Sequence, residues 1–323
     1  MKTLATLLAA ALVATALAGC ANNTTTTTPT GNTTGTPTTG GTPTPTTPGA
    51  NGSLVREVTF VAMQSAAPGP NATNITYSFT GPDAASAGWL TIHLQNKAPE
   101  PHQAVLYKVP QGLTFAQFQA SLMEQPHEGE EENETHDDDH GPEPAGGVGF
   151  ATPGGNATAV VRVEPGKYAV VCFIPGPSGM PHAMAGMMRE LNVTAAPANQ
   201  PPTANVTLTM KDFEFNLSKN LTAGRHVVEV HNLGPSHHEA PLIHLAPNAT
   251  AMDFIAYFDP SNTPTGPPPV VGGAGVGSIP TGAKQYMVLD LVPGRYAFVC
   301  FESSGEDAPP HFALGMVHEF DVA

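Results

Sequence analysis

Short runs of alternating apolar and polar residues fill the chain after residue 53, and Pro, Gly and Asn separate them. Alternation with a period of two is typical of β-strands that bury one face. The first half of this region has the runs SLVREVTFVAM, NITYSF, GWLTIHLQN, QAVLYKV, ATAVVRV, KYAVVCF and MMRELNV. The second half has ANVTLTMKDFEF, RHVVEVHN, APLIHL, KQYMVLDL, RYAFVCF and VHEFDV. This pattern predicts an all-β protein made of two tandem antiparallel β-sandwiches with Greek-key connections.

One stretch in each half has helical periodicity instead. Residues 114–122 (TFAQFQASL) and 249–258 (ATAMDFIAYF) place apolar residues at helix spacing, each after the strand that follows a histidine. An apolar stripe of this kind is ordinarily a packing surface. We therefore expect one short helix in each half, covering a sheet.

The 323-residue chain leaves about 270 residues after its N-terminal region, enough for two domains of roughly 120 to 140 residues. The Pro-rich stretch AAPANQPP begins at residue 195. We expect a first domain at 54–194, a linker at 195–203 and a second domain at 204–323.

The N-terminus has the features of an export signal. A short Ala-rich apolar run follows Lys2 and ends in Leu-Ala-Gly before Cys20. This resembles a lipoprotein signal, which predicts a signal peptide at 1–19, lipidation of Cys20 and anchoring on the outer face of a cell membrane. The alternative is a plain signal peptide that happens to contain a cysteine.

Residues 20–53 are rich in Thr, Pro and Gly and contain too few apolar residues to offset the entropy of ordering them. We expect a disordered stalk. Thirteen Asn-x-Ser/Thr triplets occur between Asn22 and Asn248, which indicates a glycosylated surface protein. A Thr-rich chain also produces such triplets by chance.

The chain has three cysteines, and two of them occupy matching places in an internal repeat. YAVVCFIPGPSGMPHAMAGMM (168–188) and YAFVCFESSGEDAPPHFALGMV (296–317) both present Tyr, Cys, His and Gly-Met in that order. A disulfide between Cys172 and Cys300 would need the two backbones within about 7 Å. Since these positions are equivalent interior strands of two domains, we expect each cysteine to have a partner of its own.

A third shared position lies upstream. NKAPEPHQAVL (96–106) aligns with NLGPSHHEAPL (232–242), so that His102 matches His238. His237 is a rival to His238, but its counterpart in the first repeat is Pro101. Each repeat therefore holds His, Cys, His and Met, and the two sets are His102, Cys172, His182, Met187 and His238, Cys300, His311, Met316.

This combination suits copper that cycles between Cu(I) and Cu(II). Two imidazoles and a thiolate in a plane, with a weak axial thioether, form a site that changes little between the two oxidation states. One histidine comes from a distant strand and the other three ligands surround one loop, so the site forms only on folding. The sequence predicts two type 1 copper sites.

At these residues the chain resembles the cupredoxin, or blue copper, family over both domains. The resemblance implies Greek-key sandwiches and type 1 ligand roles for the eight residues above. The chain has nine and ten residues between the Cys and the second His. Such loops are longer than in small electron-carrying cupredoxins and nearer to those of copper nitrite reductases.

The same resemblance argues against an enzyme. Multicopper oxidases and nitrite reductases carry a His beside the ligand Cys, whereas Val171 and Val299 precede the cysteines here. We expect a membrane-anchored carrier of single electrons with a redox partner that the sequence does not identify. The alternatives are a copper chaperone, store or interaction module without electron transfer, and a sandwich that has lost copper.

An acidic segment interrupts the first domain at 124–143. It carries ten acidic and no basic side chains, which accounts for most of the net charge of −15. Such a run is ordinarily a solvated, disordered insert. Its three histidines, His127, His136 and His140, also suit weak binding of Cu(II) or Zn(II), and its charge suits steering of a basic redox partner. A chain this acidic is not expected to bind nucleic acid.

The two Cys-to-His loops differ in charge. FIPGPSGMP carries none, whereas FESSGEDAPP carries Glu302, Glu306 and Asp307. Because negative charge favours the cupric state, we expect the copper of the second domain to have the lower reduction potential.

Overall fold

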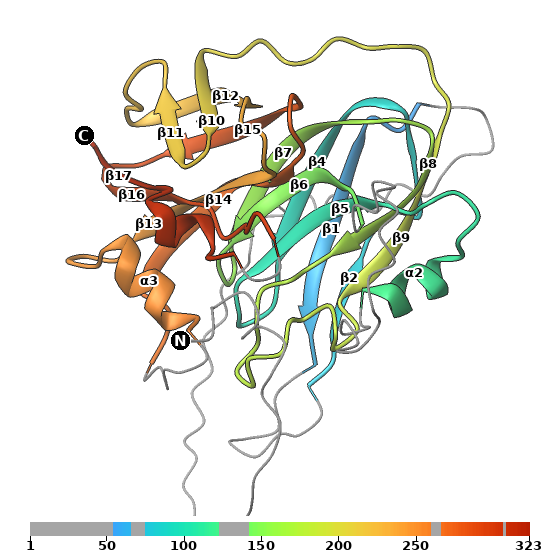
Figure 1. Ribbon diagram of the computed structural model, residues 1–323, viewed down its shortest axis with the longest axis horizontal. Helices are drawn as coiled ribbons and strands as arrows, with labels where there is room; N and C mark the ends of the chain where they lie inside the picture. The colour runs from blue at the N-terminus through green and yellow to red at the C-terminus, as the bar shows by residue number, and fades with distance from the viewer. Residues whose placement is uncertain (1–53, 66–74, 123–141, 260–265, 306–307) are drawn as a thin grey trace, which may run out of the picture. The chain divides into compact units, whose positions relative to one another are not determined.

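Two β-sheets build the described part of the chain, one of eight strands and one of nine (Figure 1). The computed structural model describes residues 54–65, 75–122, 142–259, 266–305 and 308–323, and Leu54–Ala323 cluster as one unit. The expected signal peptide, Cys20 and stalk lie outside the described residues, as does nearly all of the acidic insert. In the described ranges, no helix is both long enough and apolar enough to cross a membrane.

Alternating burial along the strands confirms the period-of-two pattern. In β4, for example, Leu90, Ile92 and Leu94 are buried and the residues between them are half-buried. The first repeat contains β1 (Glu57–Gln64), β2 (Tyr77–Thr80), β3 (Ala84–Ser86), β4 (Gly88–Asn96), β5 (His102–Lys108), β6 (Pro144–Ala151), β7 (Asn156–Val163), β8 (Gly166–Val171) and β9 (Met188–Thr194). The second contains β10 (Val206–Lys211), β11 (Glu214–Leu217), β12 (Gly224–Asn232), β13 (His238–Leu245), β14 (Val270–Ile279), β15 (Lys284–Leu291), β16 (Gly294–Val299) and β17 (Val317–Val322).

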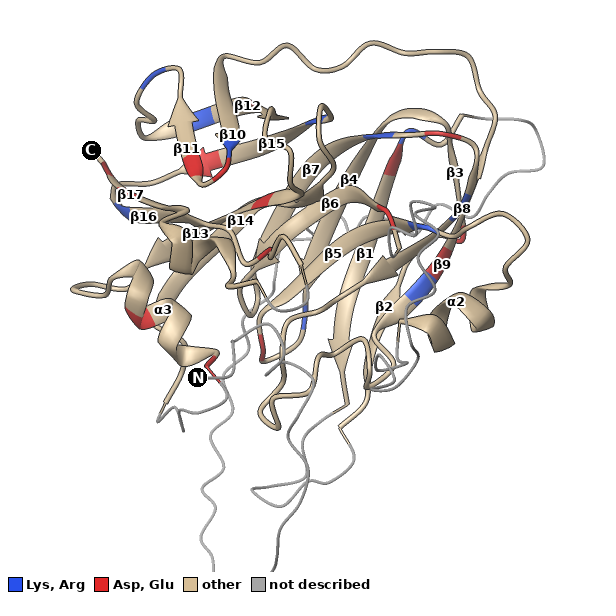
Figure 2. Ribbon diagram, in the orientation of Figure 1, with Lys and Arg blue, Asp and Glu red and all other residues tan. Residues whose placement is uncertain are grey.

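Strands from both repeats share each sheet. The order is β11-β10-β12-β15-β7-β4-β1-β2 in one sheet and β17-β16-β13-β14-β6-β5-β8-β9-β3 in the other. Consecutive strands pass from one sheet to the other, for example β4 to β5 and β6 to β7, and apolar side chains of both sheets form one core cluster. Charged residues are sparse along the strands (Figure 2). The expected all-β sandwich class is confirmed.

Each repeat has the short helix that its periodicity predicts. α2 (Phe115–Ser121) buries Phe118 against Val171 on the outer face of the nine-stranded sheet. α3 (Ala251–Tyr257) buries Phe254 and Ile255 in the equivalent way. Thr114 and Thr250 cap the two helices through capping boxes, which satisfy the free N–H groups of the first turn.

Three strands are absent from the predicted runs, the short β3 and two strands that are rich in glycine. β6 (PAGGVGFA) and β14 (VVGGAGVGSI) occupy equivalent places in the repeats. Glycine weakens the strand signal, yet these positions need it. A Cβ on Gly147 would lie 2.2 Å from the Ala104 carbonyl oxygen, and one on Gly275 would lie 2.2 Å from that of Ala240. In addition, the single run ANVTLTMKDFEF forms two strands, β10 and β11.

The repeats meet through equivalent strands. β7 pairs antiparallel with β15, and β6 pairs antiparallel with β14 through Val148 and Val276. Antiparallel pairing of a strand with its own equivalent is the geometry of a two-fold interface. The domain limits and the linker at 195–203 stay predictions, because both sheets run through both repeats.

Candidate metal centres

Strand ends bring the predicted ligands together. The first predicted ligand histidine of each repeat begins a strand, His102 in β5 and His238 in β13. Each cysteine directly follows a strand, since Cys172 comes after β8 and Cys300 after β16. β8 pairs with β5 and β16 pairs with β13, so a cysteine lies beside a histidine in both repeats.

A buried asparagine holds the turn before each of these histidines. The side chain of Asn96 donates hydrogen bonds to the carbonyls of Glu100 and Ala151, 2.7 and 3.0 Å away. Asn232 makes the equivalent bonds to Ser236 and Ile279, at 2.8 and 2.9 Å. The sequence alignment places both asparagines six residues before the histidine, and the structure gives the reason.

The first His-Cys-His group is fully buried. Cys172 Sγ lies 3.6 Å from His102 Nδ1 and 3.5 Å from His182 Nδ1. All three side chains have 0% exposure. The sulfur also accepts a hydrogen bond from the backbone N–H of Gln103 at 3.4 Å.

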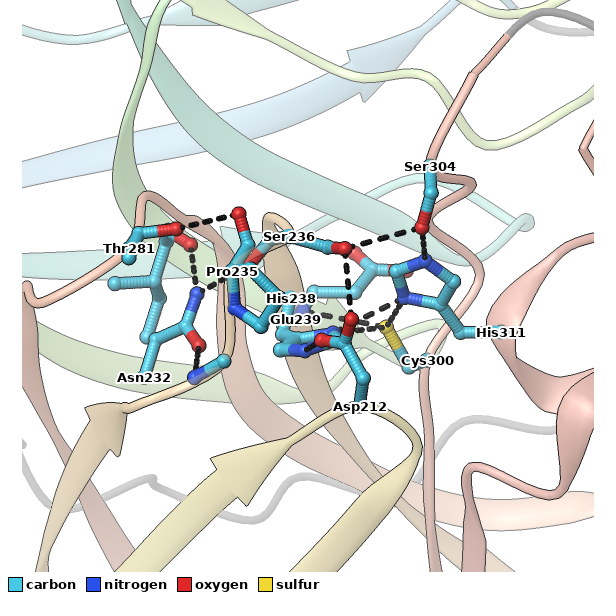
Figure 3. A network of polar contacts seen from close by, with 12 residues as sticks. Asp212, Asn232, Pro235, Ser236, His238, Glu239, Thr281, Cys300, Ser304 and His311 are labelled. Atoms are coloured by element: carbon cyan, nitrogen blue, oxygen red, sulfur yellow. Dashed lines mark hydrogen bonds and ion pairs between the residues drawn. The ribbon is translucent and has the colours of Figure 1, made fainter.

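The second group repeats this arrangement, and Figure 3 shows its polar contacts. Cys300 Sγ lies 3.8 Å from His238 Nδ1 and 3.5 Å from His311 Nδ1, and the two Nδ1 atoms are 3.0 Å apart. The backbone N–H of Glu239 donates to this sulfur at 3.5 Å. All three side chains again have 0% exposure.

The two Cys-to-His loops close in the same way despite their different lengths. The Ala183 N–H donates to the Cys172 carbonyl, and the Phe312 N–H donates to the Cys300 carbonyl. Each cysteine N–H donates in turn to the carbonyl of the predicted methionine ligand, Met187 or Met316. The extra residue of the second loop is therefore absorbed before His311. His311 itself begins a 3-10 turn, His311–Leu314.

Both methionines are fully buried and belong to the same core cluster as the cysteines. Their backbone bonds to the cysteines hold them next to the two groups. An axial role for their sulfur atoms stays a prediction.

Groups around the first centre fix the orientation of His182. Glu100 Oε2 lies 3.0 Å from His182 Nε2, and Glu100 also accepts hydrogen bonds from the side chains of Gln64 and Tyr77. The Tyr77 ring stacks on the His182 ring with centroids 4.0 Å apart. His102 Nε2 is buried and makes no hydrogen bond within the described residues.

Around the second centre the carboxylate contacts the other histidine. Asp212 Oδ1 lies 2.7 Å from His238 Nε2, and Asp212 Oδ2 accepts from Ser236 Oγ at 3.0 Å (Figure 3). His311 Nε2 instead lies 2.8 Å from Ser304 Oγ. The ring next to His311 is that of Phe213, at 4.8 Å between centroids.

Strand register shows that the groups around the two centres occupy equivalent positions, but with different residues at each position. β1 pairs with β4 as β10 pairs with β12, which matches Gln64 with Asp212 when Asn96 is matched with Asn232. Glu100 matches Ser236 by the same alignment. Each centre thus has one carboxylate in contact with a ligand histidine. It comes from the turn in the first repeat and from the residue directly after β10 in the second.

Burial favours the neutral form of both cysteines and of His102, His238 and His311 through their pKa values. It raises the pKa of Cys172 to about 12 and that of Cys300 well above its ordinary value. It lowers the pKa of His102 to about 3 and that of His311 to about 4, with the neighbouring histidine adding to both shifts. A buried thiol of this kind gives up its proton only when a cation replaces it.

Around the first centre, burial opposes ionisation of Glu100, but hydrogen bonds from His182 and Gln64 hold its pKa below the ordinary value. A charged Glu100 accepts a hydrogen bond from the Nε2–H of His182. Nδ1 of this ring then carries no proton and is free to bind a metal. The carboxylate and hydroxyl partners of His238 and His311 do the same for those rings.

The donor atoms fit copper. Imidazole nitrogen at about 2.0 Å and thiolate sulfur at about 2.3 Å from a metal are roughly 3.7 Å apart when the bonds enclose 120°. The sulfur to nitrogen distances here are 3.5 to 3.8 Å. Two imidazoles with one thiolate, all buried, are the donor set of a type 1 site. The two His-Cys-His groups therefore fit two type 1 copper sites.

The structure brings six of the predicted ligands into two groups, and Cys20 lies outside the described residues. His237 does not join a group. No disulfide links Cys172 and Cys300, which are both free. Sequence reasoning missed the outer partners Glu100 and Asp212, because they occupy positions that do not match between the repeats.

Comparisons with known proteins give only distant similarity. No protein-family model matches the chain, and no curated protein matches it. Reduced auracyanin from Roseiflexus castenholzii is 17% identical over 44% of this chain and 99% of its own, with a TM-score of 0.26. A multicopper oxidase is 13% identical over 83% and 88% of the two chains, with a TM-score of 0.22. The copper-containing nitrite reductase of Thermus scotoductus SA-01 is 10% identical over 83% and 61%, with a TM-score of 0.23. Similarity this low does not determine what the chain does.

Proposed function

We propose that this protein carries single electrons through two type 1 copper centres. The observation that carries the proposal is the repeated, fully buried His-Cys-His group. A buried methionine accepts a backbone hydrogen bond from each cysteine. Copper bound by these ligands supplies a one-electron couple.

The protein residues contribute rigidity and exclude water. Each cysteine sulfur accepts a backbone N–H, and three of the four histidine rings are fixed by a partner on Nε2. Ligands held in this way cannot rearrange when the charge of the centre changes, which favours fast electron transfer. The 0% exposure of the ligands disfavours the alternative of a copper chaperone, since handing over a metal ion requires an accessible ligand.

We further propose that the protein acts outside the cytoplasm, held at the membrane through Cys20, and that it does not act as an enzyme. The groups of three His, Cys, Asp or Glu side chains that could hold a metal in the described residues are the two above. A redox partner with a basic face would suit a chain with a net charge of −15.

Copper loading tests the proposal. The protein should bind two coppers tightly and show an intense visible band from thiolate-to-copper charge transfer. Cys172→Ser and Cys300→Ser should each remove one coloured site and leave the other. Redox titration should then show a reversible one-electron change at each remaining site. A colourless protein with two bound coppers would contradict the proposal, and a coloured protein that cannot be reduced and reoxidised would favour storage.

A further inference from the structure

A cavity of about 370 Å³ lies where the two repeats meet, outside both metal centres. Its walls include alternate residues of β5 and β13, the beginnings of both Cys-to-His loops, and α3. Ala104 of β5 and Ala240 of β13 point into the core, whereas their neighbours Val105 and Pro241 line the cavity. The cavity is therefore on the outer face of the nine-stranded sheet.

The cavity adjoins both centres through one position of the repeat, which is Gln103 in the first and Glu239 in the second. Gln103 and Glu239 each follow a ligand histidine, and their N–H groups donate to the two cysteine sulfurs. Both residues also line the cavity. In each repeat a residue that lines the cavity is thus the direct chain neighbour of a predicted ligand.

Most of the cavity wall is apolar and aromatic. Phenylalanine rings come from both loops, from β6 and from α3, and they include Phe173, Phe301, Phe150 and Phe254. Phe254 makes edge contacts with Phe150 and with Phe301. Rings in such an arrangement accept a flat apolar group, and a ring face attracts a cation.

Two carboxylates interrupt this apolar wall, Glu239 and Glu302. Glu239 accepts a hydrogen bond from the Phe301 N–H at 3.0 Å. Among the described residues, neither carboxylate lies within ion-pair distance of Lys, Arg or His, and the nearby basic group is the His237 ring, which acts on Glu302 from a longer distance. Both residues are half-buried. Two neighbouring carboxylates repel each other when both are charged, so a cation between them would be favourable.

Nearby Ser278 supports this interpretation. Its side chain lines the cavity, is 3% exposed and interacts with Glu302, but its hydroxyl makes no well-formed hydrogen bond in the described part of the chain. Ser278 therefore adds a buried hydroxyl beside Glu302 to this polar part of the wall.

The first repeat shows that the fold does not require these acidic residues. The position of Glu239 is occupied there by Gln103, and that of Glu302 by Ile174. Ser278 matches Phe150, because Ile279 and Ala151 pair with the equivalent histidines. At these three positions the second repeat has two acidic residues and a serine where the first has uncharged or apolar residues. All three residues of the second repeat line this cavity.

We propose that this cavity binds a small aromatic amine in its cationic form. The ammonium group would bind between Glu239 and Glu302 through charge-assisted hydrogen bonds, and the ring would pack among the phenylalanines. An uncharged aromatic molecule would gain no ionic contact with the two carboxyl groups. A simple ammonium ion would leave the apolar wall uncovered. The volume lies within the usual range of small-ligand pockets.

Calorimetry on the metal-free full chain tests this with tryptamine, 3-ethylindole and ethylamine as probes. Tryptamine should bind at least tenfold more tightly than the uncharged ring or the ring-free amine. Because copper is absent, failure here would leave the electron-transfer proposal standing. Equal binding of tryptamine and 3-ethylindole, or no binding of tryptamine at millimolar concentration, would overturn the inference.

Variants locate the site. Glu239→Gln and Glu302→Gln should each weaken tryptamine binding about tenfold, and Asp321→Asn, an exposed carboxylate on β17, should not change it. Ser278→Phe introduces the residue of the first repeat and should fill the cavity and abolish binding. The thermal unfolding midpoint shows whether this last variant has folded. If it has not, the two Gln variants decide, and unchanged affinity in both would overturn the proposal.

Discussion

Gln64 and Asp212 occupy the same position in the two repeats, but only Asp212 contacts a histidine of a metal centre. Gln64 instead donates a hydrogen bond to Glu100, which holds His182 in the first centre. Each centre thus has one carboxylate in contact with a ligand histidine, but the two carboxylates act on different rings. In the first repeat the carboxylate acts on the loop histidine, and in the second it acts on the strand histidine.

Asp212→Asn should raise the reduction potential of the second centre. The carboxylate favours the oxidised state by roughly 1 kcal/mol at an effective dielectric near 40, which corresponds to about 45 mV for a one-electron couple. Asparagine can still accept the Nε2–H of His238, so the ring should keep its orientation. Redox titration in the Cys172→Ser background measures the second centre alone.

The matched change in the first repeat is Glu100→Gln, measured in the Cys300→Ser background. It should raise the potential of the first centre by a similar amount, because Glu100 contacts His182 as Asp212 contacts His238. Glu57→Gln removes an exposed carboxylate that pairs with His93, and it serves as the control. A potential that does not move in either carboxylate variant would show that these groups only position the rings.

Gly147→Ala should destabilise the protein by about 2 to 6 kcal/mol, because two costs combine. The new Cβ would lie 2.2 Å from the Ala104 carbonyl oxygen, and φ of Gly147 is +133°. Overpacking and a positive φ each cost about 1 to 3 kcal/mol. Denaturant unfolding of the metal-free protein measures the sum.

Two other glycines separate the costs. Gly112 has φ of +94° with nothing within 4 Å, so Gly112→Ala should show the backbone cost alone. Gly305 is open and has no unusual φ, so Gly305→Ala should be nearly neutral. Equal effects at Gly147 and Gly112 would mean that β6 can move away from β5.

Much of this structure follows from local patterns in the sequence. Alternation predicts strands such as β4, helical spacing predicts α2 and α3, and the internal repeat predicts both His-Cys-His groups. What escapes are features fixed by contacts between distant segments. β6 and β14 contain glycine because other strands approach closely, and this removes the alternating side chains that would reveal them.

The outer groups of the centres escape for a related reason. Glu100 and Asp212 carry out the same task from different positions, so aligning the repeats hides them. Only the pairing of β1 with β4 and of β10 with β12 shows which residues are equivalent. The cavity also depends on tertiary contacts, because its walls come from both repeats.

Removing the copper should make stability depend on His102 at mildly acidic pH. Burial lowers the pKa of His102 to about 3, whereas an unfolded histidine titrates near 6.5. The unfolded state therefore binds more protons, and the stability due to a neutral His102 is complete above pH 6.5 and is lost as the pH falls toward 3. The slope is at most about 1.4 kcal/mol per pH unit.

Glu239 acts with the opposite sign. Burial and the nearby Glu302 raise its pKa to about 8, so its contribution is lost as the pH rises from about 4.5 to 8. Because Glu239 is present in both proteins, the difference in unfolding free energy between the metal-free wild type and His102→Gln isolates the contribution of the histidine. Unfolding free energies at pH 7.0, 6.0 and 5.0 should converge as the pH falls. Parallel curves would show that His102 binds a proton as readily in the folded state as in the unfolded state.

The copper of the second repeat should have the lower reduction potential, by tens of millivolts. Glu239 and Glu302 lie beside Cys300, where the first repeat has the uncharged Gln103 and Ile174. One carboxylate about 8 Å from a centre contributes roughly 1 kcal/mol at a dielectric near 40, or about 45 mV, and salt reduces this. Electrons would then pass from the second centre to the first. Redox titration of Cys172→Ser and Cys300→Ser at pH 9, above the pKa of about 8 of Glu239, compares the two centres when that carboxylate is charged. Equal potentials, or a higher one at the second centre, would mean that the predicted axial methionines or loop hydration outweigh these charges and that the direction is reversed or absent.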